Sequence, residues 1–227
     1  KRKAIRGGDL GGGGGSFASE LNADGTLDGD QFEQHLARGP KLVAFTHVSN
    51  ALGTVNDVKH WTARAHDAGA TVLVDGAQSV PHLAVNVQEL DVDFYTFSGH
   101  KTYGPTGIGI LYGKEALLDA MPPWRGGGEM IDTVSFEKGT TFNELPFKFE
   151  AGTPHISGGI ALGASLDWMN DVGLAALTGH EHVLTMHAHD VLADIDGLTF
   201  YGTAPCKAGV VSFLVDGVHP YDLGTLL

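Results

Sequence analysis

The feature that most constrains the fold of this chain is an alternation of short apolar runs with a helical segment. Residues 42–46, 71–75 and 94–97 are continuous runs rich in β-branched and aromatic residues, as expected for strands that are covered on both faces. Between the first two runs, apolar residues recur at helical spacing over residues 57–68, and residues 108–112 add a further strand. This order predicts an α/β fold with a mainly parallel sheet layered by helices.

Polar side chains follow each of the first three strand-sized runs. Asn50 comes shortly after the first run, Asp75 ends the second, and Ser98, His100 and Lys101 follow the third. In open parallel sheets, ligands bind beyond the carboxyl ends of the strands. We therefore expect these five side chains to share one crevice.

The chemistry of these groups favours a cofactor that carries a phosphate and a reactive carbonyl. Asp75 is expected to be desolvated, and to be ionised only beside a positive partner such as a protonated ring nitrogen. The amine of Lys101, in a glycine-rich loop, can become a nucleophile toward a carbonyl carbon. Ser98 and His100 offer hydrogen-bond donors to a phosphate. Alone, the Asp could simply cap a helix and the Lys could simply be solvated. Because both lie at the ends of neighbouring strands, a functional site is the better interpretation.

Five longer motifs carry a resemblance to a known family: residues 46–54, 74–78, 97–109, 125–130 and 149–154. From about residue 21 to 227, the chain resembles the class V aminotransferases, and among them the SufS-type group II cysteine desulfurases and selenocysteine lyases. The resemblance implies the pyridoxal-phosphate (PLP)-dependent transferase fold, fold type I, with PLP as cofactor. It also implies conversion of L-cysteine to L-alanine, with sulfur passed to an acceptor protein for iron-sulfur cluster assembly.

The resemblance also implies roles for single residues around the cofactor ring. Lys101 would hold PLP through a Schiff base and shuttle a proton. Asp75 would pair with the protonated pyridine nitrogen, and Gln78 would donate a hydrogen bond to the phenolic oxygen. In such enzymes the cofactor acts as an electron sink for the carbanion that forms on the amino acid.

Four further residues complete the implied site. Ser98 and His100 would bind the cofactor phosphate, and Asn50 would lie beside the cofactor and the substrate. Thr153 would reach the phosphate of the neighbouring subunit, so the resemblance implies a homodimer.

The chain divides into three predicted parts. Residues 1–16 form a flexible glycine-rich lead-in, 17–159 a partial large cofactor-binding domain with an irregular excursion over 121–149, and 160–227 a linking helix and an incomplete small C-terminal α/β domain. Helix breaks are expected near Gly173 and Gly179, a strand is expected over residues 208–215, and a helix begins near residue 221.

Parts of the family pattern are missing from this sequence. The loop with the sulfur-accepting cysteine, and a nearby arginine, would follow Leu227, while a ring-stacking histidine and a phosphate-binding threonine would precede the matched region. Cys206 lies before the last strand and is interpreted as structural. We expect this chain alone to bind cofactor poorly and to desulfurate cysteine slowly or not at all. Two alternatives stay open: another class V lyase, aminotransferase or epimerase, or a catalytically inactive dimerising scaffold.

Charge and composition limit which partners and which cellular location are expected. A net charge of -13 repels nucleic acid and anionic lipid, so neither is expected as a partner. One cysteine and no secretory signal favour a cytoplasmic protein. No metal is expected, because the histidines of residues 180–189 are not three or four apart. Residues 20–31 have the approximate spacing of a calcium-binding loop, but we expect a tight turn at residues 22–25 instead.

Overall fold

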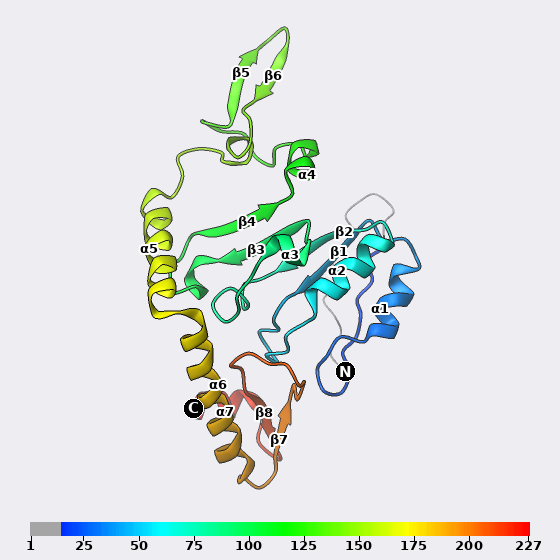
Figure 1. The fold of residues 1–227 in the computed structure, drawn as a ribbon, viewed down its shortest axis with the longest axis vertical. Coiled ribbons are helices and arrows are strands. Elements are labelled where there is room, and N and C mark those ends of the chain that lie inside the picture. The colour runs from blue at the N-terminus through cyan, green and yellow to red at the C-terminus, as the bar shows by residue number, and fades with distance from the viewer. Residues whose placement is uncertain (1–14) are drawn as a thin grey trace.

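The structure, a computed structural model, describes residues 15–227. Its centre is a four-stranded sheet with strand order β1-β2-β3-β4 (Figure 1). The strands are β1 (Leu42–Thr46), β2 (Thr71–Asp75), β3 (Phe94–Ser98) and β4 (Gly109–Gly113). β1, β2 and β3 pair in parallel, whereas β4 runs antiparallel to β3. The predicted α/β fold with a mainly parallel sheet is confirmed. The predicted lead-in, except for its last two residues, lies outside the described residues.

Two helices pack on the sheet beside β1 and β2: α1 (Gly29–Leu36) and α2 (Val58–Asp67). α2 begins at the cap residue Asp57, whose carboxylate accepts a hydrogen bond of 3.0 Å from the backbone N of His60. It ends before Gly69, which has a left-handed φ of +76°. The predicted helix is therefore confirmed. The buried core includes apolar side chains of α1, α2, β2 and β3: Phe32, Leu36, Val58, Ala65, Val72, Val74 and Tyr95.

The segment that precedes α1 contains the predicted tight turn. The backbone N of Gly25 donates to Asn22 O at 2.9 Å, and Gly25 has a φ of +89°, which favours glycine. The hydroxyl of the buried Thr54 donates to Gly25 O at 3.0 Å. This contact holds the turn against the loop that follows β1.

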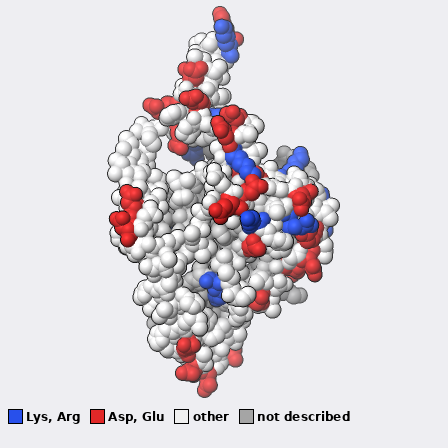
Figure 2. All heavy atoms as spheres, viewed as in Figure 1, with Lys and Arg blue, Asp and Glu red and all other residues white. Residues whose placement is uncertain are grey.

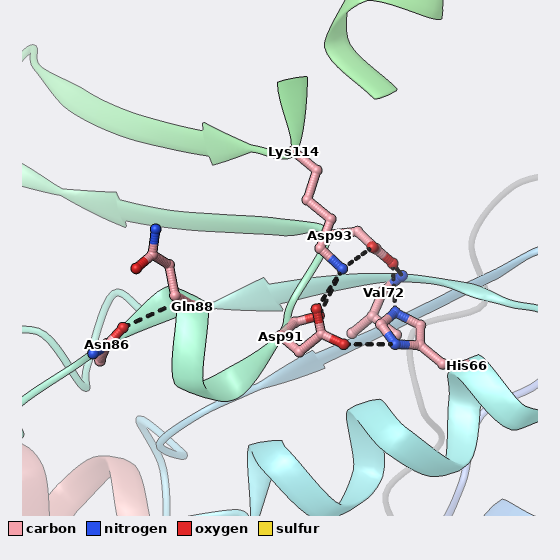
Figure 3. Close-up of polar contacts among 7 residues, drawn as sticks. All are labelled: His66, Val72, Asn86, Gln88, Asp91, Asp93 and Lys114. Carbon is pink, nitrogen blue, oxygen red and sulfur yellow. Dashed lines mark hydrogen bonds and ion pairs between the residues drawn. The ribbon is translucent and has the colours of Figure 1, made fainter. Parts of the chain in front are cut away.

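A buried carboxylate fastens the amino-terminal ends of β2 and β3. Asp93, just before β3, accepts a hydrogen bond of 2.7 Å from the backbone N of Val72. It also lies 2.9 Å from both His66 Nε2, on α2, and Lys114 Nζ, just after β4 (Figure 3). Asp91 contacts the same two side chains, at 3.5 Å and 2.7 Å. We call His66, Asp91, Asp93 and Lys114 the Asp93 cluster; it joins α2, β2 and β4 to the start of β3.

Short helices make several of the connections. α3 (Val87–Leu90) precedes β3, and the 3-10 helix η1 (Gly99–Lys101) follows it directly. α4 (Glu115–Ala120) comes after β4, and a second 3-10 helix, η2 (Phe147–Phe149), lies just before the long helices of the C-terminal part.

The expected irregular excursion over 121–149 is wrong for its middle part, which is a β-hairpin. β5 (Ile131–Ser135) and β6 (Gly139–Phe142) pair antiparallel and project from the body of the protein (Figure 1). The β-branched residues of this stretch favour strands, and Gly139, with a φ of +79°, ends the turn between them. The glycines and prolines on both sides obscured this pattern in the sequence.

Two consecutive helices, α5 (Ile156–Val172) and α6 (Leu174–Ala193), lead away from the sheet. The predicted break at Gly173 is confirmed, because this residue has a φ of +86°. The break expected near Gly179 is wrong, since α6 continues through it. A single glycine in a helix costs only about 1 kcal/mol relative to alanine, and the helix formers around it carry the helix across.

The C-terminal part contains the antiparallel pair β7 (Leu198–Tyr201) and β8 (Ser212–Val215), followed by α7 (Pro220–Leu226). The strand expected over 208–215 thus begins later than predicted. This part is tied to the loop after β1, because Val55 N donates to Cys206 O at 3.0 Å and Ala208 N donates to Gly53 O at 2.9 Å. The thiol-bearing residue Cys206 is exposed. No helix within residues 15–227 is long and apolar enough to cross a bilayer.

We expect Asp93→Asn to lower the free energy of unfolding at pH 7 by about 2–3 kcal/mol, because the amide cannot replace a buried, charge-paired acceptor. Urea unfolding measures this. Asp67→Asn is the matched control: Asp67 also pairs with a basic residue, Arg64, but its side chain is 70% exposed, so little change is expected. Equal losses in both variants would contradict a special role for the Asp93 cluster.

The pH dependence of this difference follows from the pKa of Asp93. Burial alone would raise that pKa, but the hydrogen bonds from Val72, Lys114 and His66 outweigh it and hold the pKa below its ordinary value of 3.8. The ionised carboxylate therefore stabilises the fold above the ordinary pKa, and this contribution is lost as the pH falls through the lowered value. We expect the unfolding free energies of the wild type and Asp93→Asn to converge in strong acid. A constant difference would contradict this.

Candidate active site

The parallel pairing of β2 and β3 brings most of the predicted site residues to one edge of the sheet. Asp75 ends β2 and lies opposite Thr96 of β3. Ser98 ends β3, and η1 begins with the next residue and contains His100 and Lys101. Both strands thus end at the same edge, and the groups that follow them share it.

Ser98 and His100 form a polar pair at this edge. The Ser98 hydroxyl oxygen lies 2.7 Å from His100 Nδ1, and both side chains keep access to solvent. Together they offer an O–H and ring N–H groups, which are suited to an anionic ligand such as a phosphate.

Hydrogen bonds hold the backbone around Lys101 in place. Gly99 N donates to Ile108 O, and Thr102 N and Gly104 N both donate to Gly99 O, each at 2.9 Å. Lys101 itself is half-buried, and within the described residues its Nζ has no hydrogen bond or ion pair. A fixed backbone with an unpaired amine suits a lysine that reacts with a ligand.

The loop is also tight and locally strained. A Cβ at Gly99 would lie 2.8 Å from Cγ2 of Ile108, so only glycine fits there. Tyr103, two residues after Lys101, has a left-handed φ of +57°, which is costly for a residue other than glycine. Strained backbone of this kind is concentrated at functional sites.

Asp75 is exposed, which corrects the expectation that it is desolvated. The reason is that the strand end opens on the sheet edge instead of being covered by a neighbouring element. Its Oδ1 accepts a hydrogen bond of 2.9 Å from Ala77 N. Gln78 follows in the same turn and is half-buried. We call residues 75–80 the Asp75 turn.

The other two predicted residues lie on other segments of the chain. Asn50 is exposed in the turn after β1, the strand that pairs in parallel with β2. In this turn the Ser49 hydroxyl accepts hydrogen bonds from the backbone N of Ala51 and of Leu52, at 3.3 Å and 3.2 Å. Thr153 is exposed just before α5, beside a glycine segment to which it is tied by Gly152 N donating to Gly128 O at 2.9 Å. No hydrogen bond within the described part of the chain joins Thr153 to the β2–β3 edge. The role predicted for it lies across a dimer contact and stays a prediction.

Three residues that the sequence analysis did not single out form a buried group at the Asp75 turn, and one of them, Ser79, belongs to the turn itself. His47, Tyr95 and Ser79 are all buried and form one hydrogen-bonded chain. A signal for them was present, because a tyrosine inside an apolar strand needs a partner for its hydroxyl when it is buried. The partners themselves are distant in sequence.

The groups at this edge fit PLP by their donor and acceptor chemistry. Asp75 supplies an exposed carboxylate to accept from a protonated ring nitrogen, Ser98 and His100 supply donors to a phosphate, and Lys101 supplies an unpaired amine to a carbonyl. Gly107, with a φ of +83°, allows the neighbouring backbone to turn closely around such a ligand.

Comparisons with known proteins show the family of this chain. Residues 17–227 match the family model described as aminotransferase class-V. A cysteine desulfurase from Enterobacter sp. (strain 638) is 51% identical over 207 residues, which are 91% of this chain and 51% of that protein. The chain therefore spans about half the length of the curated relatives it matches.

Solved structures give the same result and confirm the predicted fold class. The cysteine desulfurase CsdA (S-sulfonic acid) from Escherichia coli superposes with a TM-score of 0.85 at 42% identity, over 91% of this chain and 51% of that one. A C-DES variant with glycine covalently linked to its PLP cofactor superposes with a TM-score of 0.73 at 26% identity, over 83% and 51%. The chain belongs to the class V aminotransferase family.

Proposed function

We propose that the protein is a PLP-dependent cysteine desulfurase, a transferase that converts L-cysteine to L-alanine and passes the sulfur to an acceptor. The observation that carries this proposal is the shared edge of β2 and β3: Asp75 ends one strand, and the Ser98–His100 pair and Lys101 lie at the end of the other. The 51% identical cysteine desulfurase supports the choice of reaction within the family.

Each residue would make a separate contribution. PLP, when bound, supplies an electron sink that stabilises negative charge on the amino acid. Asp75 would hold a proton at the ring nitrogen, and Gln78 would orient the ring through its phenolic oxygen. Lys101 would bind the cofactor covalently and move a proton at the substrate Cα.

The remaining roles concern binding and orientation. Ser98 and His100 would bind the phosphate, and Asn50 would lie beside the ring and the substrate. Thr153 would reach the phosphate bound by a second copy of the chain. We further propose a cytoplasmic location, a sulfur-acceptor protein as partner, and a role in iron-sulfur cluster assembly. Residues 17–159 would form the large cofactor-binding domain, and 160–227 a linking helix and part of the small domain.

A homodimer is supported by the apolar surface of the described chain. The β5–β6 hairpin projects from the body, and Val134, Phe136 and Phe142 on it are exposed. An isolated two-stranded hairpin is at best marginally stable in water. The surface over α5 and α6 also shows few charged side chains in Figure 2. We propose that a second copy of the protein covers the hairpin.

We expect the purified protein, mixed with PLP, to show an absorbance near the edge of the visible range that depends on Lys101. Lys101→Ala removes the amine proposed for the linkage, so the band should be lost. Lys138→Ala, at the exposed tip of the β5–β6 hairpin, is the matched control and should keep it. Equal absorbance in Lys101→Ala and the wild type would refute the proposed function.

Product analysis separates the desulfurase from other family reactions. Release of both alanine and sulfide from cysteine, in the presence of a thiol reductant, supports desulfuration. Alanine without sulfide would indicate a different lyase, and binding of PLP with no turnover would indicate the inactive scaffold. The measurement is made on the longest chain that contains this sequence, with Lys101→Ala as the blank.

We expect the protein to be a dimer in solution, and the double variant Val134→Asp/Phe136→Asp to shift it toward the monomer. The two charges would be buried without partners in the proposed contact. Light scattering coupled to size-exclusion chromatography measures the mass over a range of concentrations. Glu137→Gln, in the turn of the same hairpin, is the control and should stay dimeric. A wild type that is monomeric at all concentrations would contradict the proposal.

A further inference from the structure

A buried chain of hydrogen bonds runs from β1 through β3 to the Asp75 turn. His47 Nδ1 lies 2.9 Å from the hydroxyl oxygen of Tyr95. That oxygen makes a short hydrogen bond with the Ser79 hydroxyl, and Ser79 donates to Gly76 O at 3.0 Å. We call His47, Tyr95 and Ser79 the His47 network. It joins two strands to the turn that carries Asp75.

The groups in this network are neutral, and their order fixes the direction of the hydrogen bonds. Burial lowers the pKa of His47, and burial raises the pKa of Tyr95 to about 12. A carbonyl oxygen can only accept, so Ser79 donates to Gly76 O and accepts from Tyr95. The Tyr95 oxygen in turn accepts from the Nδ1–H of His47. Every polar hydrogen in the chain therefore has an acceptor.

The network touches the Asp75 turn at two points. The Tyr95 hydroxyl binds the hydroxyl of Ser79, which belongs to the turn and donates to Gly76 O within it. The Tyr95 ring lies directly against Gly76, where an added Cβ would lie 2.1 Å from the ring. Burial is the main cause of the raised pKa of Tyr95; the hydrogen bond between Tyr95 and Ser79 opposes it, and the negative charge of Asp75 adds to it. The turn is therefore in direct contact with Tyr95, through a hydrogen bond to Ser79 and through packing on Gly76.

Packing alone does not require this arrangement. A phenylalanine at position 95 would fill the same space against Gly76 and would bury no hydroxyl. Tyrosine instead buries a hydroxyl that needs both a donor and an acceptor, and these come from two other elements. The hydroxyl adds a directional constraint on the turn, which an apolar ring does not provide.

We propose that the His47 network is a positioning device for the Asp75 turn: it holds Asp75 and Gln78 in the orientation in which they meet the ring of the cofactor. Its members act through the turn and do not touch the cofactor themselves. This inference rests on the proposed function, because it assigns the turn to cofactor binding.

The test is Tyr95→Phe, with hydrogen exchange of the Asp75 turn measured first without PLP. We expect exchange of the turn amides to rise about three- to tenfold, the effect of losing one buried hydrogen bond, while exchange in α1 and α2 stays as in the wild type. With PLP present, we expect the cofactor to bind about three- to tenfold more weakly and its absorbance to titrate at a shifted pH. Ser79→Ala should reproduce these changes, and the double variant should add little, because the two hydroxyls act as one chain.

Tyr112→Phe is the matched control. Tyr112 lies opposite Tyr95 on β4 and packs against the same core, and within residues 15–227 its hydroxyl makes no side-chain hydrogen bond. It should leave both readouts unchanged. If Tyr95→Phe behaves like Tyr112→Phe, the inference is overturned. It is equally overturned if Tyr95→Phe speeds exchange uniformly, because the tyrosine then only fills the core.

The two proposals fail in different ways. If the wild type shows no Lys101-dependent absorbance with PLP, the proposed function is refuted. Hydrogen exchange would then still show whether the network holds the turn. Normal absorbance in the wild type, with unchanged exchange and affinity in Tyr95→Phe, would remove only the positioning role.

Discussion

The parallel register between β2 and β3 is the constraint on which the candidate site depends. It sets Asp75 opposite Thr96, so that the backbone of both strands ends at the same edge. η1 then follows β3 without a linker, and its hydrogen bonds to Gly99 O and from Gly99 N to Ile108 O fix where Lys101 emerges. A slip of one residue would turn the side chain of Asp75 to the other face of the sheet. The site is therefore a consequence of strand pairing, more than of any single loop.

The two ends of this sheet carry different kinds of polar group. At the amino-terminal ends of β2 and β3, each charged side chain of the Asp93 cluster contacts a partner within the chain, so its hydrogen bonds contribute to stability. At the opposite edge, Asp75 accepts one hydrogen bond from its own turn, and Lys101 has no partner among the described residues. Polar groups with unused bonding capacity, held on a rigid sheet, are what a ligand requires.

The sequence predicted those parts that depend on local patterns. The strands, α2 with its Asp57 cap and the end at Gly69 follow from residue type and spacing, and so does the convergence of Asp75 with Lys101. The β5–β6 hairpin was missed because flanking glycine and proline outweighed a short β-branched stretch, and Gly179 was overestimated as a helix breaker. Exposure of Asp75 depends on which elements cover the strand end, and no local pattern encodes it. The His47 network was missed because its contacts join residues 48 and 16 positions apart.

The two main groups of the proposed site, Asp75 and Lys101, differ in how freely they can move. Asp75 begins a turn in which Ser79 donates to Gly76 O and the Tyr95 ring lies against Gly76, so the backbone that carries its carboxylate is held in place. Lys101 has an equally fixed backbone, but its side chain is long and has no partner among residues 15–227. A group that stabilises charge in one place benefits from rigidity, because reorienting it during the reaction would cost free energy. A group that must bind, release and carry a proton needs rotatable bonds. In the proposed site, the His47 network would therefore contribute rigidity at Asp75, while Lys101 would stay free to move.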